Sequence, residues 1–196
     1  MSTFEYIIVE SKGAVGIITL NRPKMLNALS FGVFREIAAA VDDLEADDKI
    51  GCILLTGSEK AFAAGADIKE MQPKDFIEMF SADFAAVGGD RIARCRKPTI
   101  AAVSGYALGG GFEMALMTDI SVIGRDTKIG MPATRFLGPA LGSLHMFFHR
   151  LGPVLARRLL LTGDIIEAGT IEHLGIFTDT CDAASVQARA ARSRSL

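Results

Sequence analysis

The sequence predicts one α/β domain. Short apolar runs rich in β-branched residues, such as residues 99–103, suit strands that are covered on both faces. Stretches of helical spacing lie between such runs, and the clearest of them follows Ser30. With 196 residues and no internal repeat, the chain is long enough for a single domain with a sizeable core. We expect this domain over residues 1–183 and a frayed tail over residues 184–196.

Composition and charge argue against several classes of protein. The net charge of −2 provides no electrostatic footprint for nucleic acid. Cys52, Cys95 and Cys181 are odd in number and far apart, which argues against a disulfide framework and favours a reducing cytosol. The N-terminus lacks a secretory signal, no apolar run approaches the ~18 residues of a spanning helix, and residues 194–196 are not a peroxisomal address. We therefore expect a cytoplasmic protein with neither membrane nor nucleic-acid partners.

The first part of the chain predicts a hairpin and a capped helix. Residues 6–9 and 15–20 are β-rich and flank a turn at residues 11–13, and residues 21–24 stop the second strand. Ser30 can cap a helix whose apolar positions recur at helical spacing, namely Phe34, Ile37, Val41 and Leu44. The acidic residues 42–48 at its end are interpreted as a solvated face rather than a metal site, because no calcium-loop pattern accompanies them.

The middle of the chain predicts a buried strand at residues 53–56, followed by small residues at 62–67. Small side chains there either let backbone N–H groups face a ligand or only pack closely. Residues 72–94 read as a loop and an amphipathic helix. Its aromatic and methionine stripe is interpreted as core in preference to a wall for an acyl chain, and consists of Phe76, Met79, Phe80 and Phe84.

The later part of the chain predicts further strands and helices. We expect a strand at residues 120–123, a connector at 128–132, and helices at 142–151 and 153–161 that are split at the Gly-Pro pair between them. A short helix at 167–173 and a last strand at 175–178 follow. His145 and His149 have metal-ligand spacing, but without an acidic third ligand nearby we interpret them as packing or solvent-facing residues.

The most informative stretch is residues 99–117. A buried strand leads into three glycines at 109–111, which allow close approach of the backbone, and then into helix formers. The free N–H groups and positive dipole end of that helix can stabilise negative charge on a ligand. Glu113 lies in the first turn, where an acid is more often only a partner of the helix dipole.

Other glycine and serine motifs are absent. The glycines at 105 and 109–111 do not form the dinucleotide-binding pattern, and no P-loop or nucleophile elbow is present.

Five segments in this order and spacing resemble the crotonase (enoyl-CoA hydratase/isomerase) superfamily. They are residues 15–23 (VGIITLNRP), 27–29 (NAL), 61–71 (AFAAGADIKEM), 97–113 (KPTIAAVSGYALGGGFE) and 161–164 (LTGD). The resemblance extends over about residues 5 to 180. It implies a crotonase-like α/β fold, a spiral of repeated β-β-α units, whose ligand is an acyl-CoA thioester.

The resemblance also assigns roles to individual residues. It implies that the backbone N–H groups of Ala66 and Gly110 hold the thioester oxygen, which agrees with the helix N-terminus found above. It raises Glu113 from dipole partner to catalytic carboxylate. It implies coenzyme A contacts by residues 24–26 and 64–69, and the positions concerned are Lys24, Met25, Leu26, Ala64, Ala66, Asp67, Ile68, Lys69 and Gly110. No cofactor other than the coenzyme A of the substrate is expected, and the implied assembly is a homo-oligomer, a trimer or dimer of trimers.

The sequence departs from the family pattern in two places. Hydratases of the family use two glutamates, one to activate water and one to protonate Cα, and Ala133 stands where the second is expected. No Asp or Glu occurs from Thr127 to Gly163, so Thr134, Ser143 and His145 are the candidate proton donors. Family members also run some sixty residues further, so the C-terminal helical part looks truncated.

The sequence thus predicts an acyl-CoA enzyme of the enoyl-CoA hydratase/isomerase type with Glu113 as its one matched carboxylate. Loss of a general acid typically costs ~10²- to 10⁴-fold in rate, which argues against efficient hydration. The alternatives are another one-carboxylate acyl-CoA reaction (thioester hydrolysis, decarboxylation or isomerisation) and a non-catalytic acyl-CoA-binding subunit.

Overall fold

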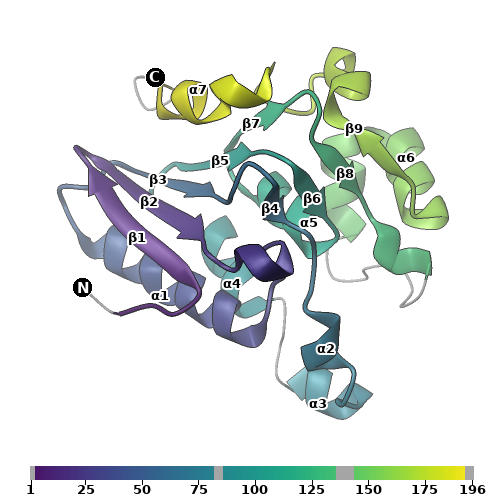
Figure 1. The fold of residues 1–196 in the computed structure, drawn as a ribbon, viewed down its shortest axis with the longest axis horizontal. Coiled ribbons are helices and arrows are strands. Elements are labelled where there is room, and N and C mark those ends of the chain that lie inside the picture. Colours follow the sequence, from purple (N-terminus) through teal and green to yellow (C-terminus); the bar gives the residue numbers. More distant parts are fainter. Residues whose placement is uncertain (1–2, 82–85, 136–143, 193–196) are drawn as a thin grey trace.

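The computed structural model describes residues 3–81, 86–135 and 144–192. Strands and helices are interspersed throughout the described residues (Figure 1). The strands are β1 (Ile7–Lys12), β2 (Val15–Leu20), β3 (Cys52–Thr56), β4 (Ala61–Ala63), β5 (Thr99–Val103), β6 (Tyr106–Leu108), β7 (Ile120–Gly124), β8 (Lys128–Gly130), β9 (Ile165–Glu167) and β10 (Asp179–Cys181). The α-helices are α1 (Phe31–Ala46), α2 (Ile68–Met71), α3 (Phe76–Ser81), α4 (Ala86–Ala93), α5 (Gly110–Met117), α6 (Leu144–Thr162) and α7 (Val186–Arg192). The 3-10 helices are η1 (Pro23–Met25), η2 (Pro132–Arg135), η3 (Ala168–Leu174) and η4 (Ala183–Ser185).

The larger sheet has six strands in the order β1-β2-β3-β5-β7-β10. The β1–β2 hairpin is antiparallel and every other pair is parallel. Every residue of β3 and β5 is buried, which explains why these strands read as continuous apolar runs. The hairpin and both central strands are therefore confirmed.

The smaller sheet has four strands in the order β4-β6-β8-β9. Along the chain β3, β5 and β7 of the larger sheet are each followed directly by a strand of the smaller sheet, β4, β6 and β8, and then by helix. This repetition is the predicted spiral of β-β-α units. It brings the ends of β4, β6 and β8 side by side, because β4, β6 and β8 pair in parallel.

Helix α1 lies under the larger sheet with α4 beside it (Figure 1). Ser30 caps α1 as predicted, since its Oγ accepts a hydrogen bond from the Val33 N–H. The predicted apolar positions of this helix are buried in the main core, together with side chains from α5 and α6. Helix α6 is interrupted at Gly152, which has φ 70° and ψ 164°, where the sequence predicted the split.

The opposite face of the larger sheet is covered by α7. A frayed tail was expected from residue 184, yet residues 186–192 are helical, and Val186 and Ala190 are buried against Leu54, Ile100 and Val122. The two residues are four apart, one helical turn, a signal too short to stand out in the sequence. Residues 193–196 lie outside the described part of the chain.

Other differences concern short elements. The connector predicted at 128–132 contains strand β8, and β6 was not predicted; strands of three residues carry little periodicity. The last strand is Asp179–Cys181, shifted from the predicted 175–178, because residues 168–174 form η3 and Gly175 ends it in the left-handed region. Of the Phe/Met stripe, Met79 is half-buried, Phe84 lies outside the described residues, and the side chains of Phe76 and Phe80 are likewise not described.

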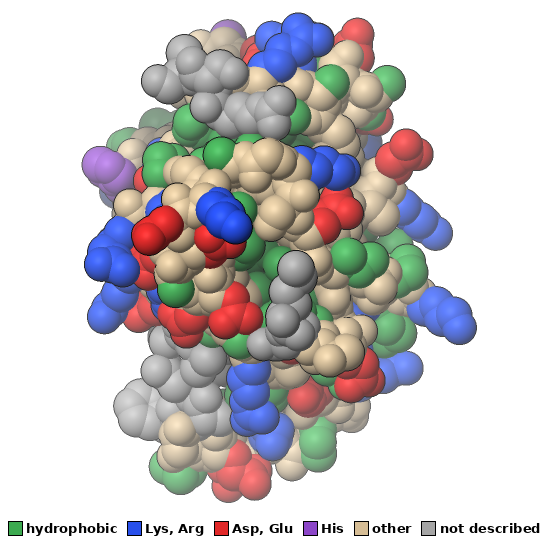
Figure 2. All heavy atoms as spheres, turned by 90° about the vertical axis from the view of Figure 1, so that its left-hand side faces the viewer, with side chains coloured by type: hydrophobic (Ala, Val, Ile, Leu, Met, Phe, Trp, Pro, Cys, Tyr) green, Lys and Arg blue, Asp and Glu red, His purple; other side chains and the backbone are tan. Residues whose placement is uncertain are grey.

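On the face shown in Figure 2, acidic and basic side chains are interspersed, and hydrophobic side chains gather only in small separate patches. None of the described helices has the length and apolar character needed to cross a membrane.

Candidate active site

The centre of the site is the turn between β6 and α5. Gly109 has φ 51° and ψ −126°, a backbone conformation that only glycine adopts readily. Its N–H donates to the Gly130 carbonyl oxygen at 2.9 Å, which ties the turn to the end of β8. The next residue begins α5, so the free N–H groups of the helix start here.

The two glycines that follow have different surroundings. A Cβ on Gly111 would lie 2.1 Å from the Ala63 carbonyl oxygen, so Gly111 permits close packing of α5 on β4. A Cβ on Gly110 would lie 3.4 Å from Leu29 Cδ1 and 3.9 Å from Glu113 Oε2, which are both side-chain atoms. Gly110 is therefore the glycine that opens toward the carboxylate.

Glu113 lies in the first turn of α5, and its side chain is half-buried. Its backbone N–H donates to the Gly109 carbonyl oxygen at 3.0 Å. The residues on either side of it, Phe112 and Met114, are buried, and the Phe112 ring meets the Phe147 ring edge-on at 5.6 Å. The core thus fixes the helix that carries the carboxylate.

The second backbone segment of the site follows β4. It lies between residues 26–29 on one side and β6 on the other. The N–H of Ala64 donates to the Leu26 carbonyl, that of Leu29 to the Gly65 carbonyl, and that of Asp67 to the Leu29 carbonyl. Among the described residues, the N–H of Ala66 has no acceptor.

The two backbone segments lie next to each other. A Cβ on Gly109 would be 3.8 Å from the Gly65 Cα, and one on Gly65 would be 3.2 Å from the Leu108 carbonyl oxygen. The structure therefore brings together Ala66, Gly110 and Glu113, which the family resemblance assigned to one site.

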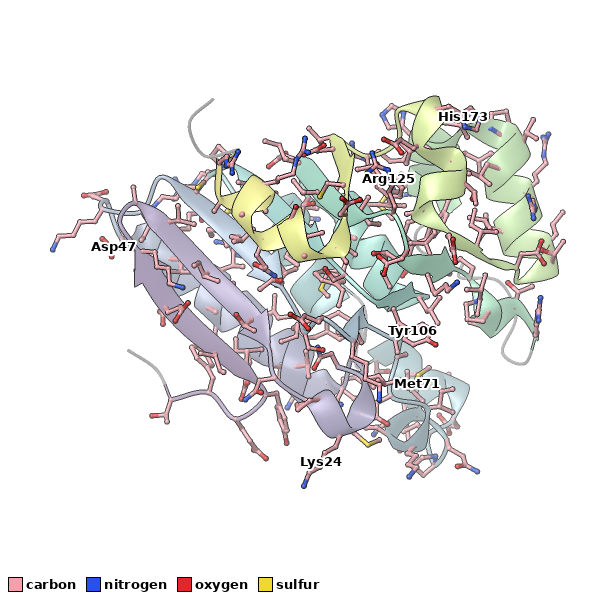
Figure 3. The ribbon with its side chains drawn as sticks, turned by 45° about the horizontal axis from the view of Figure 1, so that its top comes forward. Lys24, Asp47, Met71, Tyr106, Arg125 and His173 are labelled. Carbon is pink, nitrogen blue, oxygen red and sulfur yellow. The ribbon has the colours of Figure 1, made fainter. Side chains whose placement is uncertain are left out.

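The segment with the predicted coenzyme A contacts at residues 24–26 is held by an unusual turn. Leu26 and Asn27 both have positive φ, 49° and 56°. The buried Asn27 side chain accepts from the Arg22 N–H and donates to the carbonyls of Ala61 and Phe62. These bonds fix the segment beside β4, while the Lys24 side chain points away from the body of the protein (Figure 3).

The side chain of Asp67, another residue with a predicted coenzyme A contact, forms an ion pair within the protein. Its carboxylate is 2.9 Å from the Arg22 guanidinium, and the two side chains are only 9% and 19% exposed. Arg22 also donates to the Ala28 carbonyl and lies over the Tyr6 ring, with 5.5 Å from its guanidinium carbon to the ring centroid.

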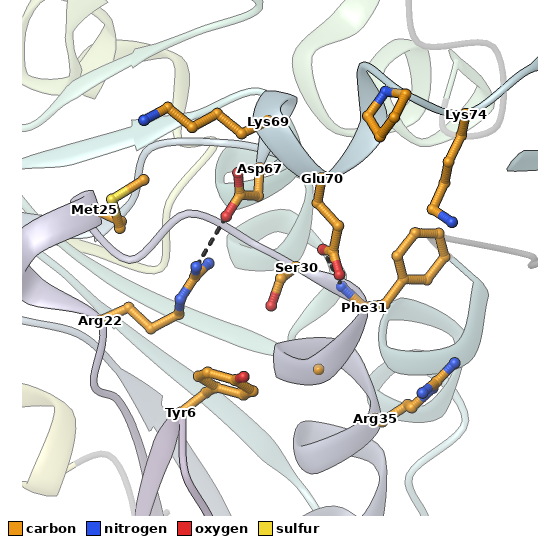
Figure 4. Close-up of a pocket in the computed structure, with 12 residues that line it drawn as sticks. Tyr6, Arg22, Met25, Ser30, Phe31, Arg35, Asp67, Lys69, Glu70 and Lys74 are labelled. Carbon is orange, nitrogen blue, oxygen red and sulfur yellow. Dashed lines mark hydrogen bonds and ion pairs between the residues drawn. The ribbon is translucent and has the colours of Figure 1, made fainter.

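A pocket of about 870 Å³ lies between the start of α1 and the segment around α2 (Figure 4). Met25, Asp67 and Lys69 of the predicted contacts line it, whereas Ile68 is 45% exposed and does not. Arg35 and Lys74 line it too, and Lys74 Nζ lies 5.4 Å from the centroid of the Phe31 ring. Among the described residues, no carboxylate forms an ion pair with Arg35, Lys69 or Lys74.

The candidate proton donors are less well supported. Ala133 lies in η2, shortly after Gly130. The Thr134 hydroxyl donates to the Leu160 carbonyl at 2.8 Å, so its proton is already engaged. His145 and His149 are exposed, and Ser143 lies outside the described residues. Within the described ranges no His, Cys, Asp and Glu side chains group as metal ligands.

Comparison with known proteins gives a consistent result. A family model described as enoyl-CoA hydratase/isomerase matches residues 10–194. A probable enoyl-CoA hydratase of Rhizobium meliloti (strain 1021) is 46% identical over 175 residues, which are 89% of this chain and 68% of the relative. The mitochondrial enoyl-CoA hydratase of Pongo abelii is 43% identical over 185 residues, which are 92% of this chain and 63% of that protein.

Solved structures agree with these matches. Subunit I of an enoyl-CoA hydratase from Geobacillus kaustophilus HTA426 superposes with a TM-score of 0.92 at 38% identity, over 99% of this chain and 76% of that one. An enoyl-CoA hydratase from Mycobacterium tuberculosis H37Rv superposes with a TM-score of 0.83 at 29% identity, over 97% and 81% of the two chains. The architecture is thus the crotonase fold. The chain belongs to the enoyl-CoA hydratase/isomerase family.

Two features of the site were not predicted. Arg35 and Lys74 were not singled out, because the pocket forms only where α1 meets the segment after α2, about forty residues later. The contact of the Leu29 side chain with Gly110 was also missed, although the NAL motif drew attention to the residue. No spacing in the sequence marks either feature.

Proposed function

We propose that this protein is an acyl-CoA enzyme of the enoyl-CoA hydratase/isomerase type, with an oxyanion hole formed by the backbone N–H groups of Ala66 and Gly110 and with Glu113 as its catalytic carboxylate. The observation that carries the proposal is the convergence of the two segments. Both N–H groups belong to adjacent backbone turns, and a methyl group on Gly110 would lie 3.9 Å from Glu113 Oε2. Preorganised donors of this kind stabilise the charge that develops on a thioester oxygen.

In the proposed reaction Glu113 serves in both proton transfers. As a water oxygen bonds to Cβ of the enoyl group, the carboxylate takes a proton from that water. The electron pair of the double bond then moves toward the thioester, and the resulting enolate oxygen is held by the two N–H groups. The same carboxyl returns the proton to Cα. One water is thereby added across the double bond without a second acid.

The cations of the pocket that form no ion pair with any described residue support the coenzyme A part of the proposal. The phosphates of a coenzyme A nucleotide are anions, which suit lysine and arginine side chains that have no ion-pair partner. Lys69 extends toward Met25 and Lys74 lies over Phe31, so each of these cations lies beside an apolar side chain (Figure 4). We propose that Lys24, Met25, Leu26, Ala64, Asp67, Ile68 and Lys69 line the coenzyme A path, Asp67 through its backbone.

The test is the loss of conjugated-enoyl absorbance when crotonyl-CoA is added to the purified protein. We expect turnover in the parent, a ~10²-fold or larger loss in Glu113→Gln, and no loss in Glu59→Gln, which removes an exposed carboxylate. Turnover that survives in Glu113→Gln would contradict the assignment of the carboxylate.

A second function is favoured by the absence of any Asp or Glu from Thr127 to Gly163. One carboxylate suffices for isomerisation, decarboxylation or thioester hydrolysis through the same oxyanion hole. No hydration of crotonyl-CoA, with binding still detected by calorimetry, would favour these reactions, and product analysis would distinguish them from a non-catalytic subunit.

We also propose a cytoplasmic homo-oligomer, a trimer or a dimer of trimers. Bacterial relatives support this location, although a mitochondrial relative is also known. Light scattering on the purified chain gives the mass that decides the assembly.

A further inference from the structure

We propose that Leu29 is the positioning residue of the oxyanion hole, which sets the distance and direction between the N–H groups of Ala66 and Gly110. The inference rests on the proposed function, because it assumes that both N–H groups bind one thioester oxygen. The N–H groups come from separate elements. Another residue must therefore fix the position of one N–H group relative to the other.

The backbone of Leu29 orients Ala66. Leu29 and Ala66 form a parallel β-bridge in which the Leu29 N–H donates to the Gly65 carbonyl at 2.8 Å and the Asp67 N–H donates to the Leu29 carbonyl at 2.9 Å. In a trans peptide group the N–H points opposite to the C=O, and the Ala66 N–H shares its peptide group with the Gly65 carbonyl. Since the groups on either side of Ala66 are directed at Leu29, the Ala66 N–H points away from it, toward the side where residues 109–110 run.

The side chain of Leu29 orients Gly110. It is 0% exposed, and its Cδ1 is 3.4 Å from the position of a Cβ on Gly110. It therefore packs against the first residue of α5, whose N–H is the second donor. One residue contacts both donor segments, the first through its backbone and the second through its side chain.

Residues before and after Leu29 in the sequence fix its position. Asn27 binds the carbonyls of Ala61 and Phe62 through its side chain, and Ser30 caps α1. By contrast, within the described residues no hydrogen bond joins residues 65–66 directly to residues 109–110, which meet only through packing. The β4–β6 pairing brings the two segments together, and the packing of Leu29 then sets the spacing of the two donors beyond the ends of these strands.

Shortening Leu29 should loosen this spacing. Oxyanion donors act at 2.7–3.1 Å, and a displacement of ~1 Å costs ~10²-fold in rate. We expect Leu29→Ala to lower kcat ~10- to 100-fold with little change in KM, because the coenzyme A contacts lie elsewhere. Leu29→Val, which is less disruptive to folding, should give a smaller loss in the same direction.

The matched control is Leu44→Ala. Leu44 is also a buried leucine, but it packs against Gly16 near the other end of α1, about 20 Å along the helix from its first residue. Both variants lose similar core packing. Only Leu29→Ala should lower kcat per folded molecule.

A spectroscopic readout separates positioning from general loosening of the fold. The probe is an aryl-substituted enoyl-CoA, whose absorbance moves to longer wavelength when hydrogen bonds polarise its thioester carbonyl. We expect the parent and Leu44→Ala to shift the bound probe, and Leu29→Ala and Leu29→Val to shift it less. Gly110→Ala, whose methyl would press on Leu29, should recover part of the shift when combined with Leu29→Val.

Three outcomes decide the matter. A smaller shift and lower kcat in the Leu29 variants alone support the proposal. An unchanged shift and kcat in the folded Leu29 variants, with a normal parent, would overturn it and leave the proposed function intact. A parent that binds the probe without any shift would overturn the oxyanion hole itself, and this proposal with it.

Discussion

Charged side chains gather at both ends of helix α1, and the two groups differ in how completely they are paired. Asp47, at the C-terminal end, lies well apart from Lys24 beside the candidate site (Figure 3). The charged side chains at the C-terminal end connect α1 to α4 and to the residues that follow α4. The N-terminal group borders the pocket. The comparison shows which charges serve the fold and which are available to a ligand.

At the C-terminal end of α1 the charged side chains form ion pairs and hydrogen bonds within the protein. Arg91 forms ion pairs with Asp42 and Glu45, and the Arg96 backbone N–H donates to Glu45. That backbone bond, with the Arg91 guanidinium, lowers the pKa of the Glu45 carboxyl to about 2. The acidic segment predicted as a solvated face is therefore partly a joint between helices.

At the N-terminal end of α1 only some of the charged side chains have partners among the described residues. The Glu70 carboxylate accepts from the Phe31 N–H at the start of α1, and Arg22 pairs with Asp67. Arg35, Lys69 and Lys74 line the pocket without an ion pair to any described residue. Four predictions test whether ion pairing distinguishes the charged side chains that stabilise the fold from those that bind a ligand, and they are ordered by their expected effect on stability.

The largest effect is expected for Arg22→Met. It leaves the Asp67 carboxylate buried without its cation, and loss of one partner of such a pair costs about 3 kcal/mol. Urea denaturation measures this free energy of unfolding. Asp67→Asn should cost less, because Arg22 keeps the Ala28 carbonyl and the Tyr6 ring; an equal or larger cost would contradict this account.

Lys97→Ala should have the next effect. The Lys97 ammonium donates to the carbonyls of Leu44 and Asp47, where α1 ends with unsatisfied acceptors. We expect a loss of about 1 kcal/mol in the free energy of unfolding. The control is Arg94→Ala, whose exposed contact with Asp90 at 3.3 Å should contribute almost nothing.

The third prediction concerns acid. The pKa of Glu45 is lower in the folded protein than the 4.5 of the free side chain, so its stabilisation is complete above pH 4.5 and is lost as the pH falls toward 2. The stability of the parent should therefore decrease more steeply over this range than that of Glu45→Gln. Denaturation at several pH values measures both slopes, with Glu59→Gln expected to follow the parent.

The smallest effect on stability is expected at the pocket. Arg35→Ala and Lys74→Ala remove cations that form no ion pair in the described part of the chain, and should change the free energy of unfolding by less than about 0.5 kcal/mol. Both should weaken acyl-CoA binding several-fold in calorimetry, more strongly at low salt. If binding is unchanged while stability falls, these cations belong with the structural group.

The elements with strong sequence signals were predicted well. The capped α1, the buried strands β3 and β5, and the strand–glycine–helix unit with Glu113 all follow from periodicity, a capping serine and glycines. The glycines could be recognised but not told apart. Only the structure shows that Gly111 avoids the Ala63 carbonyl, while Gly110 opens toward Glu113.

What could not be predicted depends on contacts between distant segments. Strands of three residues, such as β6 and β8, are defined by their neighbours in the sheet rather than by their own sequence. Val186 and Ala190 are buried in a helix because this helix packs on the outer face of the larger sheet, a contact that the local sequence does not reveal. The arrangement of segments 26–29, 64–67 and 109–113 was implied by family resemblance alone, since no local pattern encodes it.

The way these three segments meet also has a consequence for folding. Leu29 reaches residues 65–67 and then Gly110 across two stretches of about forty residues each, and closing such loops costs entropy that local structure does not repay. Helices such as α1 need no distant partner to begin. In refolding, helical signal should therefore return before catalytic turnover, and activity should mark completion of the contacts among these three segments.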